Sequence, residues 1–558
     1  MTEQANYWQR LNRRRFLKQA GAGAFAGSMV LAGACGDDDA DSGGTTGGSP
    51  STAPAGSTAA VETPKLGGRL RELNTGEPDQ YDPHRDAGYP GLIAMSAVYN
   101  GLLRTRNPIG QDFKMEGDLA QGLPEQPDDK TYIFKLQPGI KWQNVAPTNG
   151  RAMTSDDIKK NFARMVTDQP DYVLRPMFEM VDKVETPDAQ TIKLTLKEPY
   201  GQFLANCADI WAKVIPPEMY DGDQAKVKPV GSGPFIFKDT KQGVGQTLDK
   251  NKDYFRKGQP YVDGIDFSIV ADGSVRASSF KAGNLDTMIG AAAQIMVQLT
   301  SDYKDANYDK RYSVPNPVMI NNSVAPFNDV RVRQALYYAM DPALIIKLAF
   351  QDLGSIGQPL PVWLKRYQLA PEKIPQRDIK KAKELLAAAG QSNLSFTNKT
   401  FQGGTAAFGT LQLQQSLKEA GIDMQNKELE WADWRKNVYG VKGDFDITIG
   451  GEFDYISPDR QLYNAFYSKG AANNRHVNDA KLDKLLIDAR REIDGNKAVD
   501  LYKQTSQYLV DNAISIWMPQ QTNWIAAQKW VKGWFWQSSA GSLFERNFMD
   551  EVWLDRKA

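Results

Sequence analysis

The sequence reads GGRL at residues 67–70, YDPH at 81–84, YNGLL at 99–103, LQPGIKW at 136–142, TSDDI at 154–158, GSGPF at 231–235 and NDVRVRQA at 328–335. Each segment alone is weak evidence of a fold. Their order and spacing together carry information about nearly all of residues 66–558. Between and beyond these segments, helix and strand patterns alternate along the chain.

Several predicted helices have recognisable ends. Thr154 can cap a helix with Asp157 at the reciprocal position, and residues 378–390 predict a helix that begins at Asp378 and that Gly390 terminates. Asp341 followed by a proline starts another helix. For that helix the pattern places three side chains inward: Leu344, Ile345 and Leu348. Strands are predicted by period-2 apolar runs at 132–136, 192–196, 265–269 and 445–449. The fold class is therefore α/β.

The seven segments resemble the large solute-binding proteins of peptide and nickel importers, a family that includes dipeptide- and oligopeptide-binding proteins. The resemblance implies a type II periplasmic-binding-protein fold with two hinged lobes and an additional inserted α/β domain. It places lobe I, which is discontinuous, at residues 66–97, 228–313 and 516–558. The inserted domain is expected at 98–227 and lobe II at 314–515.

The first 35 residues predict an export signal, with a basic cluster followed by an Ala/Gly-rich apolar run too short to span a bilayer. Arg13 and Arg14 lie in NRRRFLK (12–18), which resembles the twin-arginine export signal. Cys35 ends AGAC (32–35), which resembles the lipoprotein cleavage box, although Ala32 stands where leucine is usual. Cys35 is thus the expected lipidation site, and an ordinary cleaved signal with an incidental cysteine is the alternative.

Residues 36–65 are rich in Asp, Ser, Gly, Thr, Pro and Ala and predict a flexible tether between that cysteine and the body. Lys plus Arg equals Asp plus Glu at 67 each, so no overall field draws the chain to nucleic acid. With two histidines and two cysteines in the whole chain, soft ligands are too few for a Cys/His zinc site, and we expect no metal or other cofactor.

The resemblance also proposes ligand-binding residues. Peptide binders of the family use an aspartate four residues before a proline to receive the ligand's amino terminus, and Asp454 with Pro458 has that spacing. Gly450 follows a predicted strand and can expose backbone groups to a ligand. Trp431 aligns with a tryptophan of the pocket wall, and Trp434 is its neighbour.

Three further ligand residues follow from the same resemblance. Asn474 matches an asparagine before a family segment, Glu77 fits a carboxylate near the ligand, and Gln521 lies where the family often has tyrosines. For each of these side chains, a role in the core or on the surface is the competing interpretation. The pocket loop also lacks a tryptophan common in peptide binders, which keeps an oligosaccharide ligand open as an alternative.

The expected function is capture of a peptide or similar small solute and its delivery to the permease of an ABC importer. The protein would be an exported monomer, held by lipid at the outer face of the cytoplasmic membrane or in the periplasm. No specific catalytic motif was found, so we expect no enzyme activity. A cell-surface hydrolase with two carboxylates is the remote alternative.

Overall fold

The structure is a computed structural model that describes residues 62–74, 76–85, 88–106, 113–169, 172–289, 292–312, 315–401, 409–430, 433–439, 443–450, 456–470, 472–533 and 544–556. The chain divides into two units, Met1–Pro64 and Lys65–Ala558. Export signal, lipidation site and nearly all of the predicted tether lie outside the described residues. The lobes and the inserted domain all belong to the second unit.

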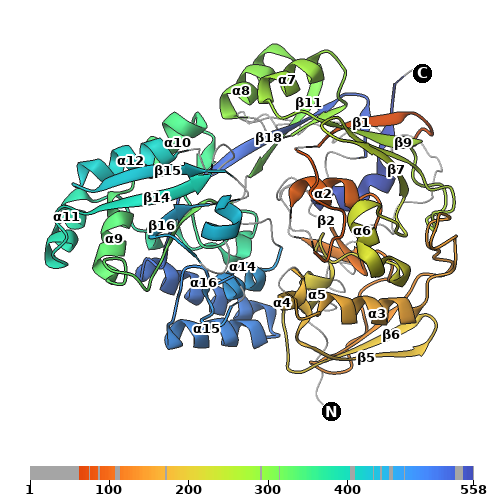
Figure 1. Ribbon diagram of the computed structural model, residues 1–558, viewed down its shortest axis with the longest axis horizontal. Coiled ribbons are helices and arrows are strands. Elements are labelled where there is room, and N and C mark those ends of the chain that lie inside the picture. The colour runs from red at the N-terminus through yellow and green to blue at the C-terminus, as the bar shows by residue number, and fades with distance from the viewer. Residues whose placement is uncertain are drawn as a thin grey trace, which may run out of the picture. The chain divides into compact units, whose positions relative to one another are not determined.

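Lobe I is built on a sheet with the strand order β1-β9-β8-β7. Its members are β1 (Arg69–Asn74), β9 (Gly264–Ile269), β8 (Gly245–Lys250) and β7 (Phe235–Lys241). β1 runs parallel to β9, with Leu70 opposite Ile265, and both of these side chains are fully buried. Because these neighbours are almost two hundred residues apart in sequence, lobe I is discontinuous. Helices α7 (Gly273–Lys281) and α8 (Ala293–Asp302) lie beside strand β11 (Figure 1).

The expected inserted domain, residues 98–227, contains a small sheet and several helices. Its three-stranded antiparallel sheet has the order β4-β6-β5, from β4 (Thr131–Lys135), β6 (Thr191–Leu196) and β5 (Val181–Asp188). A hairpin joins β2 (Leu103–Arg106) to β3 (Lys114–Gly117). The helices are α3 (Ser155–Met165), α4 (Arg175–Phe178), α5 (Phe203–Cys207) and α6 (Gln224–Val227). At α3 the predicted reciprocal cap is present between Thr154 and Asp157, which confirms the expected helix start.

Lobe II has a five-stranded mixed sheet with the order β15-β14-β16-β12-β17. Its strands are β15 (Asp423–Leu429), β14 (Ser395–Phe401), β16 (Ile447–Ile449), β12 (Pro317–Ile320) and β17 (Ser515–Trp517). Its helices are α9 (Val330–Ala339), α10 (Pro342–Phe350), α11 (Ile379–Ala388), α12 (Thr410–Glu419), α14 (Pro458–Phe466), α15 (Ala480–Arg491) and α16 (Gly495–Asp511). The predicted N-cap at Asp378 accepts a hydrogen bond from Lys381 N, and Gly390 adopts φ +70° just past the helix end.

Strands β11 and β18 lead to the two crossings between the lobes. β18 (Gln520–Gln528) pairs with β11 (Ala306–Tyr312) and β10 (Thr287–Met288), and its start pairs with β13 (Gly354–Ser355). The chain therefore passes from lobe I to lobe II between β11 and β12, and returns between β17 and β18. These two crossings make the hinge.

Two predictions about elements were wrong in detail. Leu348 was expected to face inward, but it is 47% exposed, because α10 packs through Ile345 and Phe350. The strand expected over 445–449 begins only at Ile447. Phe445 is nevertheless buried, in a cluster with Met319, Trp434 and Val438.

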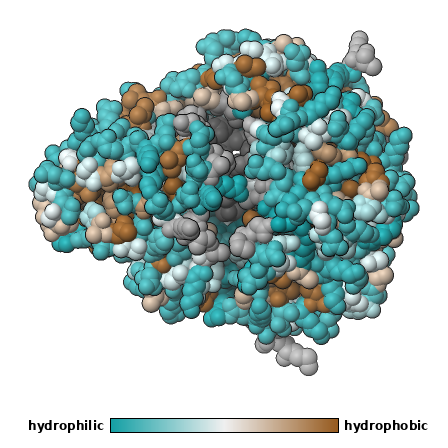
Figure 2. Space-filling model, in the orientation of Figure 1, coloured by the Kyte–Doolittle hydropathy of each residue, from teal (hydrophilic) through white to brown (hydrophobic). Residues whose placement is uncertain are grey.

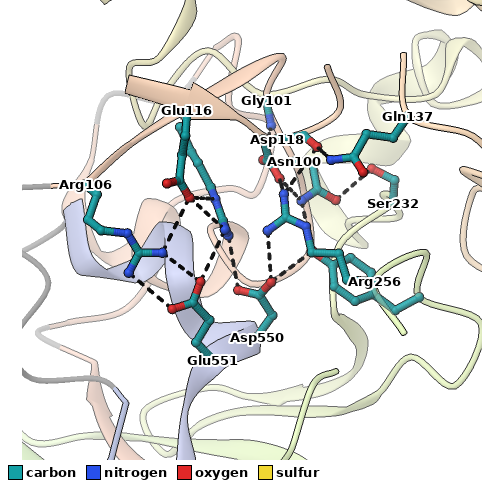
Figure 3. A network of polar contacts seen from close by, with 12 residues as sticks. Asn100, Gly101, Arg106, Glu116, Asp118, Gln137, Ser232, Arg256, Asp550 and Glu551 are labelled. Atoms are coloured by element: carbon teal, nitrogen blue, oxygen red, sulfur yellow. Dashed lines mark hydrogen bonds and ion pairs between the residues drawn. The ribbon is translucent and has the colours of Figure 1, made fainter. Parts of the chain in front are cut away.

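A buried polar network joins the C-terminal segment to the inserted domain and to Arg256 of lobe I (Figure 3). Asp550, in the 3-10 segment η7 (Phe544–Glu551), lies 3.4 Å from Arg104 Nη1 and 3.1 Å from Arg256 Nη1. Asp118 accepts from Arg256 Nη2 at 2.9 Å. Glu551 accepts from Arg106 Nη2 at 2.8 Å. The network gives each buried carboxylate a cationic partner, as burial of charge requires.

Candidate functional site

The expected ligand site lies between the lobes. Figure 2 shows this face of the molecule hollowed between them, below β18 and above α14, with hydrophilic side chains prominent around the hollow. Two-lobed binding proteins close around their ligand at the hinge between the lobes. Two of the predicted residues, Asp454 and Trp431, lie outside the described residues, as do Cys35, Arg13 and Arg14.

Gly450 and Trp434 are in direct contact. Gly450 directly follows β16, and a Cβ atom there would lie 2.7 Å from Trp434 Cζ2. The Trp434 indole is 1% exposed, and its Nε1 donates to Thr448 Oγ1 at 3.0 Å and to Lys399 O at 3.2 Å. The structure thus places Trp434 in the core, beneath the end of the strand that presents Gly450.

Asn474 is also buried, and both polar atoms of its amide are hydrogen-bonded. Its Nδ2 donates to Tyr439 O at 2.7 Å, while its Oδ1 accepts from Arg475 Nη1 at 3.3 Å. Arg475 is itself buried, and its Nε donates to Ser515 Oγ at 3.0 Å. These contacts tie the segment after α14 to β17, next to the hinge. Sequence reasoning missed Arg475, since a lone arginine in a polar stretch carries no local signal of burial.

Gln521 lies at the hinge itself. It is the second residue of β18, just after the return crossing, and it stands opposite Gly354 of β13. The side chain is 3% exposed, and its Oε1 accepts no hydrogen bond from the described residues. A buried amide oxygen without a donor is costly unless water or a ligand supplies one.

Glu77 has a different surrounding. Its Oε2 accepts a hydrogen bond from Gly243 N at 2.8 Å, in the turn between β7 and β8. This contact stabilises a hairpin of lobe I. The structure brings together Gly450 and Trp434, whereas Glu77 contacts neither of them.

The lobes also meet at a place that the sequence did not indicate. Asp459 at the start of α14 accepts from Tyr200 OH of the inserted domain at 2.6 Å and lies 3.4 Å from Arg490 Nε of α15. Burial raises the pKa of Asp459, and the positive charge of Arg490 opposes that rise. Next to it, Arg460 Nη1 lies 2.9 Å from Asp209 Oδ2. Because the partners are hundreds of residues apart, no spacing in the sequence could have paired them.

No group of three or more His, Cys, Asp or Glu side chains in the described ranges is arranged to hold a metal ion. Among the helices that the structure describes, none combines the length and apolarity needed to cross a bilayer.

The model of the family described as "Bacterial extracellular solute-binding proteins, family 5 Middle" matches residues 114–474, which is well over half of the chain. The chain belongs to this family. The family consists of binding proteins, not enzymes, so this family 5 protein is the solute-binding component of an ABC importer, as the resemblance implied.

Relatives of this family 5 protein match along most of their length. The oligopeptide-binding protein AppA of Bacillus subtilis (strain 168) is 24% identical over 84% of this chain and 89% of its own. Heme-binding protein A of Haemophilus influenzae is 28% identical over 77% of this chain and 84% of its own. The structure of DppA from Helicobacter pylori, in complex with the peptide STSA, superimposes with a TM-score of 0.77 at 23% identity, over 88% of this chain and 99% of that one. This confirms the expected α/β, two-lobed fold.

Proposed function

We propose that this solute-binding protein captures a peptide in the hollow between its lobes and delivers it to a membrane permease. The observation that supports a peptide most strongly is the likeness, over 88% of the chain, to a protein whose structure holds a peptide. The name of the oligopeptide-binding relative points the same way.

Asp454 is the proposed anchor for the peptide's amino terminus. A carboxylate held in a closing cleft forms a charge-assisted hydrogen bond with an ammonium group, which contributes about 1.5 to 3 kcal/mol. Trp431, Gly450, Asn474 and Gln521 are the other proposed contributors to the site. Trp434 would support the site indirectly, because it packs against Gly450.

The test is a thermal-shift screen of the full chain with a library of di- to pentapeptides, a set of oligosaccharides, and hemin. Binding to the folded state alone raises its stability by mass action, about 2.7 kcal/mol at a hundredfold excess over Kd. A saturable shift with peptides only supports the proposal. A shift with oligosaccharides or hemin only would overturn the peptide assignment, and hydrolysis of a bound ligand would overturn the binding function.

The role of Asp454 has its own test. We expect Asp454→Asn to weaken a peptide hit at least tenfold, about 1.4 kcal/mol, in calorimetric titration. Glu384→Gln, on the exposed face of α11, is the matched control and should leave Kd unchanged. An unchanged Kd in Asp454→Asn would remove Asp454 as the amine anchor.

We further propose that the chain is exported through the twin-arginine pathway and anchored by lipid at Cys35. The supporting features are the NRRRFLK segment, the cysteine that follows the apolar run, and the polar stretch after it. Arg13→Lys with Arg14→Lys should block export, and Cys35→Ser should release the protein from membranes in fractionation. Retention of Cys35→Ser in the membrane fraction would show another anchor.

A further inference from the structure

The inserted domain and lobe II meet through charged and aromatic side chains. The residues on either side of α5 contact α14 and the end of α15. Across this contact, Tyr200 donates to Asp459, and Asp209 pairs with Arg460. All four residues are less than a tenth exposed.

Aromatic rings enclose these charges. The Arg490 guanidinium lies 4.7 Å from the ring centroid of Tyr200, and its Nη2 donates to Pro176 O at 3.2 Å. The Arg460 guanidinium lies 5.2 Å from the ring centroid of Trp211. Arginine suits such a place, because it pairs with carboxylates and stacks on rings at the same time. Charged and aromatic side chains thus form both sides of the contact.

The backbones also approach closely here. Gly201 N donates to Arg490 O at 3.1 Å, and a Cβ atom at Gly201 would lie 2.1 Å from Glu492 O. Gly201 does not need glycine for its own backbone conformation, since its φ is outside the left-handed range. The obstacle to a side chain at this position lies entirely on the other lobe.

The position of this contact links it to the opening of the hollow. The lobes are joined covalently by the crossings between β11 and β12 and between β17 and β18, and the contact lies on the other side of the hollow from β18 (Figures 1 and 2). Rotation that opens the hollow about those crossings must separate Asp209 from Arg460 and Tyr200 from Asp459.

The chemistry of the contact suits repeated opening. For a buried ion pair, the cost of removing two charges from water roughly cancels their attraction, so the net free energy of the contact is small. Both surfaces are well hydrated when they separate, which an apolar surface would not be. When the open and closed forms are close in free energy, a ligand that binds the closed form more tightly can shift the equilibrium toward it.

We propose that Tyr200, Gly201 and Asp209 of the inserted domain form a reversible latch with Asp459, Arg460 and Arg490 of lobe II, and that this interlobe latch sets the population of the closed form. Its residues control solute affinity without touching the solute. That last effect rests on the proposed function, whereas the opening equilibrium itself does not.

Hydrogen exchange of the full chain without any solute tests the latch. The amide of residue 201 is the reporter, because its hydrogen bond crosses the contact. In Arg460→Gln we expect its exchange to accelerate at least tenfold, while the β8–β9 amides of lobe I keep their rates. Gly201→Ala, which wedges the contact apart, should raise the radius of gyration in small-angle scattering.

Controls separate the latch from a loss of folding. Gly122→Ala, in the same domain with no atom within 4 Å of the added Cβ, should change neither readout. Tyr200→Phe removes a single hydroxyl and is the mild variant if Arg460→Gln folds poorly. Unchanged exchange at residue 201 in both Arg460→Gln and Tyr200→Phe would overturn the latch. Faster exchange at residue 201 together with equally faster exchange of the β8–β9 amides would also overturn the latch. The contact would then belong to the core that unfolds with the whole protein. Since no solute is present, neither result depends on the peptide assignment.

Discussion

His84 is a fully buried imidazole whose two nitrogens are both engaged. Its Nε2 donates to Lys213 O at 2.9 Å, and its Nδ1 accepts from Arg164 Nη1 at 2.7 Å. Arg164 also pairs with Asp82 of the same YDPH turn. Burial, and then the charge of Arg164, lower the pKa of His84 to about 4. The turn is therefore held with a neutral histidine.

This arrangement predicts a pH-dependent stability. Because the pKa of His84 is below its ordinary value of 6.5 in the folded state, its contribution is complete above pH 6.5 and is lost as pH falls toward 4. By linkage the loss between pH 7.5 and 4.5 is about 2 to 3 kcal/mol. Urea unfolding of His84→Gln should show a pH dependence smaller by that amount. Equal dependence in both proteins would contradict a neutral buried His84.

Gly450 and Trp434 are the basis of a second prediction. A methyl group at Gly450 would meet Trp434 Cζ2 and Cη2 at 2.7 and 2.8 Å, and such overpacking costs about 1 to 3 kcal/mol. Gly450→Ala should lower the free energy of unfolding by that amount in urea titrations. Trp434→Phe lacks both of those atoms, so the double variant should lose less than the sum of the single ones. Strict additivity would mean that the two residues do not touch in solution.

Individual residues were the least predictable part of the site. Gly450 could be singled out because it follows a strand pattern, but the burial of Trp434 depends on Met319, more than a hundred residues earlier in the chain. Glu77 matched by position, whereas its contact with Gly243 depends on a hairpin more than 160 residues later. Side-chain environment is a tertiary property, and one sequence does not encode it locally.

The element η7 is anchored by charge, through Asp550 and Glu551 (Figure 3). Removing one partner of a buried ion pair typically costs about 3 to 5 kcal/mol, because the other charge stays buried. Asp550→Ala should therefore lower the free energy of unfolding by about that much in urea titrations. Asp555→Ala, which breaks an exposed pair with Lys65, is the control and should change the free energy of unfolding far less. Similar losses in the two variants would contradict the central role of the network.

Helix starts and strands could largely be predicted because their signals are local. Thr154, Asp341 and Asp378 cap helices as expected, and their side chains make the capping contacts. The predictions failed where tertiary packing determines which side chains are buried. Leu348 fits the apolar pattern of α10, yet the helix packs through Ile345 and Phe350 and leaves Leu348 half exposed.

For the whole molecule, fold and family followed from the order of short segments, since those segments mark turns and strand ends that the shared architecture requires. The interlobe latch could not follow, because Tyr200 and Asp459 are joined only by the way the lobes meet. The proposed function depends on lobes that close around a solute and leave it unchanged.

The decisive experiment titrates the full chain with a peptide from the thermal-shift screen while small-angle scattering follows the radius of gyration, and mass spectrometry identifies the peptide afterwards. We expect a saturable decrease in the radius of gyration at a one-to-one ratio and recovery of the intact peptide. Saturable binding without any compaction, or recovery of a cleaved peptide, would contradict closure around an unaltered solute.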